Sequence, residues 1–262
     1  MKVKTVLLAV MLVVSACGLT TTAKDCSTEK NVQIRQTTKL TPTPPAPSYP
    51  SHISLSYLPS KERKKEFIKL MLPLIEKANE EVLKEREFLL KIKGKKELSP
   101  EEKKKLQELE KKYKTNSLKE LLKRVDTVPV SLVLAQAAIE SGWGTSRFFT
   151  KANNAFGIYS YARKSKHKCL KAKESEVCLK AYPNLYESVK DYIYNINVSW
   201  AYKDFRDARS KGASLDTLIK ELEKYSVMRK QYTELVKNVI KNNHLTNFDN
   251  YALSNSSSSR PK

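Results

Sequence analysis

The sequence predicts a mainly helical α+β protein with one small β-hairpin lobe. Of its 262 residues, 29% are charged and only six are glycine, which favours long solvated helices over a turn-rich β fold. Apolar side chains recur at helical spacing in several long segments, whereas two short segments are typical of strands. The hydrophobic fraction of 40% excludes a polytopic membrane protein and a wholly disordered chain.

The first residues are typical of an export leader. Lys2 and Lys4 precede nine consecutive apolar residues (6–14), too few to cross a bilayer, which requires about 20. The leader ends in Val-Ser-Ala-Cys17, which resembles the lipobox of bacterial lipoproteins. That resemblance implies removal of residues 1–16, acylation of the Cys17 thiol and attachment to the outer membrane, facing the periplasm. A plain cleaved leader or a short buried helix is the alternative.

Residues 17–58 predict a semi-rigid extended tether, because five of the eleven prolines fall between Pro42 and Pro50. The tether would hold a folded domain away from the membrane. At the other end of the chain, residues 249–262 are rich in serine and are expected to be disordered.

Residues 59–126 predict a charged helical arm that precedes the main domain. Its early apolar residues have helical spacing, and the charges that follow suit a solvated helix face. Pro73 is expected to kink the arm. Ser99 is placed as an N-cap, with Pro100 at the first helical position and Glu102 three residues after the cap, so a second helix begins there.

Residues 127–248 predict the main domain. An apolar segment (128–140) indicates a buried helix, which the glycine-flanked Trp143 ends. A basic stretch (163–175) resembles the connection of a hairpin. Two strands and three amphipathic helices are expected, in the order 155–161, 177–182, 189–200, 215–222 and 232–240.

Three cysteines remain after the leader. Cys169 and Cys178 have eight residues between them and are placed to close a hairpin as a disulfide in the oxidising compartment that an exported protein meets. Spacing alone does not fix the Cα geometry that a disulfide needs. Cys26 would then be free or cross-linked to another chain.

Glu140 is the strongest candidate for catalysis. It ends an apolar helix and is followed by a glycine-rich turn, so its carboxyl is expected to be partly desolvated. Desolvation and the negative end of the helix dipole both raise the pKa of a carboxyl, as a general acid requires. A structural glutamate with satisfied hydrogen bonds is the alternative on these grounds alone.

The residues around Glu140 resemble a known signature. Leu-Ala-Gln-Ala-Ala-Ile-Glu-Ser-Gly-Trp-Gly-Thr-Ser-Arg (134–147) and Asn-Asn-Ala-Phe-Gly-Ile (153–158) are similar to the core of bacterial endo-β-N-acetylglucosaminidases of glycoside hydrolase family 73, especially the Bax-like branch. Weaker resemblance extends over residues 62–248. It implies a lysozyme-like helical fold with a small β-lobe, and cleavage of the β-1,4 bond after N-acetylglucosamine in peptidoglycan.

The resemblance also implies roles for particular residues. Glu140 matches the general acid of the family, and Glu176 is the best match for a second carboxylate in the β-lobe, with Glu174 as the fallback. The 2-acetamido group of the substrate is an alternative nucleophile that would make Glu176 dispensable. Tyr225 matches a tyrosine that lines the cleft, where it would bind the acetamido group or position water; a core aromatic is its alternative.

Four residues are candidates for substrate binding. Trp143 and Phe156 would stack on sugar faces or pack in the core. Asn154 would touch sugar or hold its loop through side-chain hydrogen bonds. Tyr232 completes the tyrosine-containing segment that resembles the family, and is assigned to the substrate as well.

The expected partner is the glycan of peptidoglycan, and a net charge of +21 favours adsorption to anionic envelope polymers. Nucleic acid is disfavoured by the leader, the lack of a recognition motif and the dispersion of lysines among acids. His52, His167 and His244 lack paired ligand spacing, so no metal or other cofactor is expected. The protein is expected to be a monomer.

Two rival functions stay open. A lytic transglycosylase also uses a helix-end glutamate followed by serine, but such enzymes usually carry Gly-Leu-Met-Gln where this chain has Ala-Phe-Gly-Ile-Tyr (155–159). The second rival is a lipoprotein that binds peptidoglycan without cleaving it.

Overall fold

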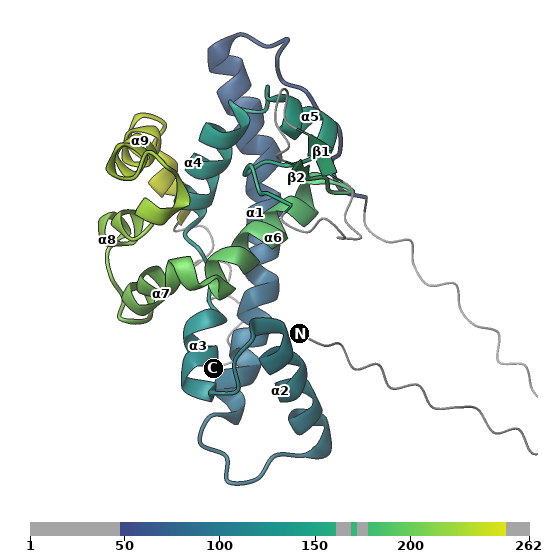
Figure 1. The fold of residues 1–262 in the computed structure, drawn as a ribbon, viewed down its shortest axis with the longest axis vertical. Helices are drawn as coiled ribbons and strands as arrows, with labels where there is room; N and C mark the ends of the chain where they lie inside the picture. Colours follow the sequence, from purple (N-terminus) through teal and green to yellow (C-terminus); the bar gives the residue numbers. More distant parts are fainter. Residues whose placement is uncertain (1–47, 161–168, 172–177, 250–262) are drawn as a thin grey trace, which may run out of the picture. The chain divides into compact units, whose positions relative to one another are not determined.

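The computed structural model describes residues 48–160, 169–171 and 178–249, which belong to one compact unit beginning at Pro47 (Figure 1). These residues are mainly helical with one two-stranded sheet, which confirms the predicted class. The predicted leader, Cys17 and Cys26, the tether up to residue 47 and the tail from residue 250 lie outside them. Within the described ranges, no helix combines the length and apolar character needed to cross a membrane.

The described helices are α1 (Ser60–Ile92), α2 (Pro100–Tyr113), α3 (Leu118–Arg124), α4 (Val130–Ser141), α5 (Arg147–Ala152), α6 (Leu185–Val198), α7 (Lys203–Ser210), α8 (Leu215–Lys220) and α9 (Lys230–Asn242). Three short 3-10 segments are η1 (Trp200–Tyr202), η2 (Glu223–Tyr225) and η3 (Leu245–Phe248). The strands are β1 (Cys169–Lys171) and β2 (Cys178–Lys180).

The first helix belongs to the core of the main domain, and the predicted boundary between residues 126 and 127 is therefore wrong. Figure 1 shows α1 running past α4 and α6, and it contacts both. Its stripe of Phe67, Met71 and Ile75 is fully buried in the same apolar cluster as α4. The side chain of Asn79 exchanges two hydrogen bonds with the Val128 backbone, of 2.9 and 3.1 Å. The charges cover only the outer face of an amphipathic helix.

The predicted start of the second helix is confirmed. Ser99 accepts a hydrogen bond from the Glu102 amide (3.2 Å), and the Glu102 side chain accepts one from the Ser99 amide (3.2 Å). This is a complete capping box with Pro100 at the first helical position. α1 continues as a helix through Pro73, where the sequence predicts a kink.

The second predicted strand (177–182) is confirmed as β2, whereas the first strand of the hairpin lies later in the chain than predicted. β1 and β2 are antiparallel, with Leu170 opposite Leu179, and Cys169 and Cys178 form a disulfide across them. Of the strand expected at 155–161, the described residues 155–160 form no regular strand, and Tyr159 makes an isolated bridge to Leu179 of β2. β1 instead lies inside the stretch predicted as a connection.

The last part of the predicted tether packs on the folded domain. The Leu55 amide donates to the Gly144 carbonyl (3.1 Å), and the His52 amide donates to Asn153 Oδ1 (2.6 Å). The Leu55 side chain is buried and lies against Gly144. Residues 48–58 therefore belong to the domain, which corrects the predicted end of the tether.

Replacing Leu55 with alanine is expected to lower the free energy of unfolding by about 2 kcal/mol, because it removes buried methyl groups and leaves a cavity. Chemical denaturation of the full chain measures the change. Tyr57→Ala is the matched control, because the Tyr57 side chain is 76% exposed and its loss should cost little. Equal midpoints for the two variants would contradict this packing.

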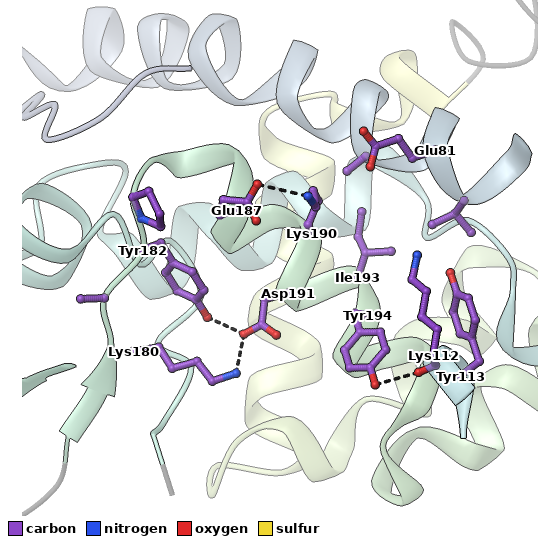
Figure 2. A pocket seen from close by; sticks show the side chains of 14 residues that line it. Glu81, Lys112, Tyr113, Lys180, Tyr182, Glu187, Lys190, Asp191, Ile193 and Tyr194 are labelled. Atoms are coloured by element: carbon purple, nitrogen blue, oxygen red, sulfur yellow. Dashed lines mark hydrogen bonds and ion pairs between the residues drawn. The ribbon is translucent and has the colours of Figure 1, made fainter. Parts of the chain in front are cut away.

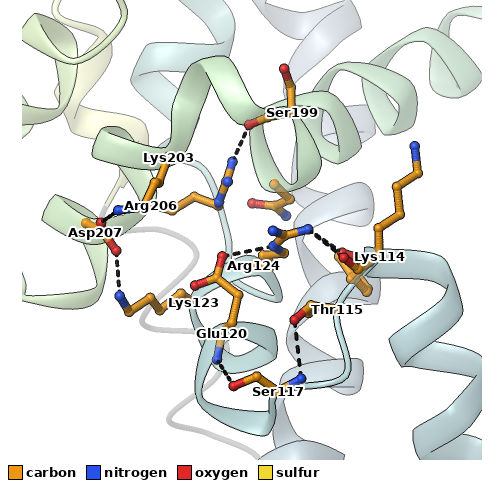
Figure 3. A network of polar contacts seen from close by, with 12 residues as sticks. Lys114, Thr115, Ser117, Glu120, Lys123, Arg124, Ser199, Lys203, Arg206 and Asp207 are labelled. Atoms are coloured by element: carbon orange, nitrogen blue, oxygen red, sulfur yellow. Dashed lines mark hydrogen bonds and ion pairs between the residues drawn. The ribbon is translucent and has the colours of Figure 1, made fainter.

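An ion pair between Lys123 and Asp207 joins α3 to α7 (Figure 3). Asp207 accepts hydrogen bonds from Lys123 Nζ (2.6 Å) and Lys203 Nζ (2.5 Å). Its neighbour Arg206 is buried and donates to the carbonyls of Ile196 (3.0 Å) and Ser199 (2.7 Å), which satisfies the end of α6.

The two lysines lower the pKa of Asp207 from 3.8 to about 2. Because the folded pKa is depressed, the stabilisation is present above about pH 4 and is lost as the pH falls towards 2. Asp207→Asn should lower the free energy of unfolding by about 1 kcal/mol at pH 7, a value reduced for solvent screening, and by almost nothing near pH 2. Denaturation at both pH values measures this, with Asp204→Asn, an exposed site, as the control. A deficit that persists at pH 2 would contradict the ion-pair explanation.

Candidate active site

Glu140 lies in the last turn of α4, where the helix emerges from the core. Gly142 adopts the left-handed conformation (φ +57°) that ends the helix, and the Trp143 amide donates to the Ala138 carbonyl (2.8 Å). Ser141 Oγ accepts from the Gly144 amide (3.0 Å) and so fixes the turn. The helix is buried up to Ala138, whereas Glu140 is partly exposed. The carboxyl therefore lies at the boundary between the core and solvent.

The surroundings of Glu140 favour its protonated form. Burial raises the pKa of this carboxyl, and a hydrogen bond of 2.9 Å from the Tyr232 hydroxyl to Oε1 lowers it by less, so the net shift is upward. The negative end of the α4 dipole acts in the same direction as burial. The pKa of Glu140 is therefore raised, which suits a proton donor.

A chain of hydrogen bonds fixes the Tyr232 hydroxyl. Tyr192 donates to Gln136 Oε1, and Gln136 Nε2 donates to the Tyr232 oxygen (3.1 Å). The hydroxyl proton of Tyr232 is thereby directed at Glu140. Gln136 lies one turn before Glu140 in α4 and is fully buried. The arrangement holds Oε1 of Glu140 in a fixed orientation.

Stacked aromatic rings form the apolar side of the site. Tyr225 stacks on Tyr232, with ring centroids 5.4 Å apart, and Phe156 stacks on Tyr192, with centroids 4.1 Å apart. The Tyr225 hydroxyl donates to the Phe156 carbonyl (3.0 Å). These rings displace water from one side of Glu140, which accounts for the desolvation that raises its pKa.

Asn154 shapes the turn that passes Glu140. Its Nδ2 donates to the carbonyls of Ile158 (3.0 Å) and Lys180 (2.9 Å). Its Oδ1 accepts from the Ile158 amide (3.1 Å) and from the Phe156 amide (3.3 Å). The turn brings Gly157, at φ +64°, so close that a Cβ there would lie 3.4 Å from Glu140 Oε2. Glycine permits both the conformation and the approach.

Most of the side chains predicted to bind substrate are buried. Phe156 and Tyr232 are each 2% exposed and Asn154 is 1% exposed, so these side chains support Glu140 from within. Trp143 is partly buried, with its ring edge-on to Phe67 of α1. The arrangement corresponds to the packing and loop-holding alternatives for Trp143, Phe156 and Asn154. The buried Tyr232 hydroxyl donates to Glu140, and its assignment to substrate stays a prediction.

The structure brings Glu140 together with Tyr225 and Tyr232, whereas Glu176 and its fallback Glu174 lie outside the described residues. Sequence reasoning missed Gln136 and Tyr192. Gln136 carried a usable signal, because a polar residue four positions before Glu140 in an apolar helix needs a buried partner. The partner itself was not indicated, since Tyr192 looks like one more member of an apolar stripe.

The chain is similar to several known proteins. Residues 115–245 match the family described as mannosyl-glycoprotein endo-beta-N-acetylglucosaminidase. The chain is 33% identical over 184 residues to Protein bax of Escherichia coli (strain K12), a match that covers 65% of this chain and 66%, just under two thirds, of that protein. The catalytic domain of the autolysin Auto from Listeria monocytogenes is 20% identical, with a TM-score of 0.44, over 74% of this chain and 90% of that one.

Proposed function

Because the chain belongs to this glucosaminidase family of glycoside hydrolases, we propose that it is a peptidoglycan hydrolase that cleaves the β-1,4 bond after N-acetylglucosamine. The observation that carries the proposal is the Glu140 carboxyl, whose pKa is raised by burial and whose Oε1 is held by Tyr232. Glycoside hydrolysis requires a protonated carboxyl of this kind beside the scissile bond.

Glu140 acts as the general acid. Its Oε2 transfers a proton to the glycosidic oxygen while the C1–O bond breaks and the bonding electron pair goes to that oxygen. Glu140 is left as a carboxylate, which the Tyr232 hydroxyl stabilises through their hydrogen bond. A water molecule then adds at C1 and returns a proton to the site.

The proposal includes two alternatives for the step at C1. In one, Glu176 supplies the second carboxylate from the β-lobe. In the other, the substrate's own 2-acetamido oxygen attacks first, and the Glu140 carboxylate later takes a proton from water. Activity in a Glu176→Gln variant would select the second form, and its loss would select the first.

Tyr225 serves as a positioning residue in this scheme. Its hydroxyl donates a hydrogen bond to the Phe156 carbonyl, and its ring stacks on that of Tyr232. It therefore holds the turn of Gly157 against α9 and keeps water from the acid. This role differs from the substrate contact that the sequence suggested.

Mass spectrometry of the ends released from purified peptidoglycan tests the proposed function. The full chain should release reducing N-acetylglucosamine ends, and its Glu140→Gln variant should release none. Release of 1,6-anhydro-muramic ends would instead identify a lytic transglycosylase. Sedimentation with the wall and no product from either chain would identify a binding protein.

We also propose that the protein is anchored in the cell envelope through a lipid on Cys17. The support is the leader sequence and the cysteine that ends it. Expression in a bacterial host with radiolabelled palmitate should label the full chain and leave Cys17→Ser unlabelled. Equal labelling of both chains would overturn the assignment.

A further inference from the structure

A cavity of about 460 Å³ lies outside the surroundings of Glu140. It is bounded by α1, the end of α2, the segment that follows β2 and one face of α6 (Figure 2). Its floor is apolar and consists of Ala78 and Val82 from α1 and Ile193 from α6, all buried. Its size is within the range of sites that hold small ligands.

Charged groups of both signs surround this floor. Glu187, Lys190 and Asp191 lie on one face of α6 because they are three or four residues apart. Lys190 Nζ is 3.1 Å from Glu187 Oε1. Asp191 accepts from Lys180 Nζ (2.7 Å) and from the Tyr182 hydroxyl (2.6 Å), as Figure 2 shows.

The opposite part of the rim has the same mixed character. Lys112 Nζ is 2.6 Å from Glu85 Oε1, and the Lys112 carbonyl accepts a hydrogen bond from the Tyr194 hydroxyl (2.9 Å). Glu81 projects from α1 into the cavity lining, and Tyr113 lies beside Lys112 (Figure 2). The cavity thus combines three lysines, three carboxylates and three phenol rings.

We infer that this cavity binds a short zwitterionic peptide, and, on the basis of the proposed function, that its source is the peptide stem of peptidoglycan. Each rim lysine already pairs with a carboxylate of the protein, so a ligand gains from this rim only if it offers charges of both signs. A neutral glycan offers no charge, and a polyanion would meet the three carboxylates. A peptide with both ammonium and carboxylate groups matches the alternating signs, and its aliphatic parts match the apolar floor and the tyrosine rings.

The side chain of Asn154 connects the cavity to the turn at Gly157 that passes Glu140. Asn154 Nδ2 donates both to the carbonyl of Lys180, which lines the cavity, and to the carbonyl of Ile158, beside Gly157. A peptide that contacts Lys180 is therefore linked to the turn at Gly157 through the side chain of Asn154 alone. Glycan strands that carry stem peptides should accordingly be bound more tightly than strands stripped of them.

The inference is tested by binding rather than by catalysis. Isothermal titration of the full chain with the synthetic peptide L-alanyl-γ-D-glutamyl-L-lysyl-D-alanine is compared with titration of the same peptide acetylated and amidated at its charged groups. Lys190→Ala, which removes a rim cation, and Ala181→Trp, which fills the cavity, should each weaken binding about tenfold or more. Lys211→Ala removes an exposed lysine at the C-cap of α7, which does not line the cavity, and should leave binding unchanged.

The outcomes separate this inference from the proposed function. The uncharged peptide should bind about tenfold more weakly than the zwitterion, and Glu140→Gln should bind both as the unmutated chain does. Equal binding of the two peptides, unchanged binding by Ala181→Trp, or no binding to a chain that cleaves peptidoglycan would overturn the inference. If the chain binds the zwitterionic peptide specifically but releases no sugar ends, the peptide site is supported and the proposed hydrolase function is overturned.

Discussion

Replacing Glu140 with glutamine is expected to lower the rate of glycosidic bond cleavage about a thousandfold, because an amide has no acidic proton to give to the leaving oxygen. Glutamine has the same shape and keeps an oxygen that accepts from Tyr232. The loss should therefore appear in kcat, with little change in fold. Release of reducing ends from purified peptidoglycan measures it.

Two controls isolate the chemistry of this substitution. Glu108→Gln changes the same functional group at an exposed position of α2 and should retain full activity. Far-ultraviolet circular dichroism and the midpoint of chemical denaturation should agree between Glu140→Gln and the unmutated chain within experimental error. More than a tenth of the original rate in a folded Glu140→Gln chain would exclude this carboxyl as the general acid.

Replacing Tyr232 with phenylalanine should slow cleavage by up to about a hundredfold, because the carboxyl loses the bond that holds its orientation. It should also move the pH profile in a defined direction. The Tyr232 hydrogen bond lowers the pKa of Glu140 against the larger effect of burial, so its removal raises that pKa further. The rate of an acid catalyst falls as the pH rises through its pKa. The alkaline limb should therefore shift to higher pH.

The dependence of kcat on pH measures this shift. Tyr57→Phe removes a hydroxyl from an exposed tyrosine and should change neither the rate nor the limb. A purely structural role for Tyr232 would reduce stability, since Gln136 loses its acceptor, but would not move the limb. An alkaline limb that stays in place or moves to lower pH in Tyr232→Phe would refute the assigned interaction.

Local signals made part of this molecule predictable. The apolar run before Glu140 and the glycine after it define a buried helix and its end, and α4 follows that pattern. Ser99 with Glu102 defines a capping box that depends only on neighbouring residues, so α2 begins where expected. Glu140 could be singled out for the same reason, because the helix end and the glycine-rich turn that place it are encoded within a few residues.

Other features depend on contacts between distant segments. Tyr232 reaches Glu140 across 92 positions and Tyr192 reaches Gln136 across 56, and neither spacing has a periodic signature. The start of the strand expected at 155–161 is instead a turn, because the Asn154 side chain binds the backbone of its own loop, and only the bridge at Tyr159 forms beyond it. The assignment of α1 to a separate arm gave too much weight to its charges, since one apolar stripe is enough to join a core.

The titration of Glu140 itself tests the central claim most directly. In the full chain labelled with [5-¹³C]glutamate, the carboxyl resonance absent from Glu140→Gln can be followed against pH. Glu102 provides an internal reference, because hydrogen bonds from Lys95 and Ser99 lower its pKa below the usual 4.5. We expect the Glu140 resonance to titrate clearly above 4.5, and therefore at higher pH than that of Glu102. A Glu140 that titrates at or below 4.5 would contradict its assignment as the proton donor.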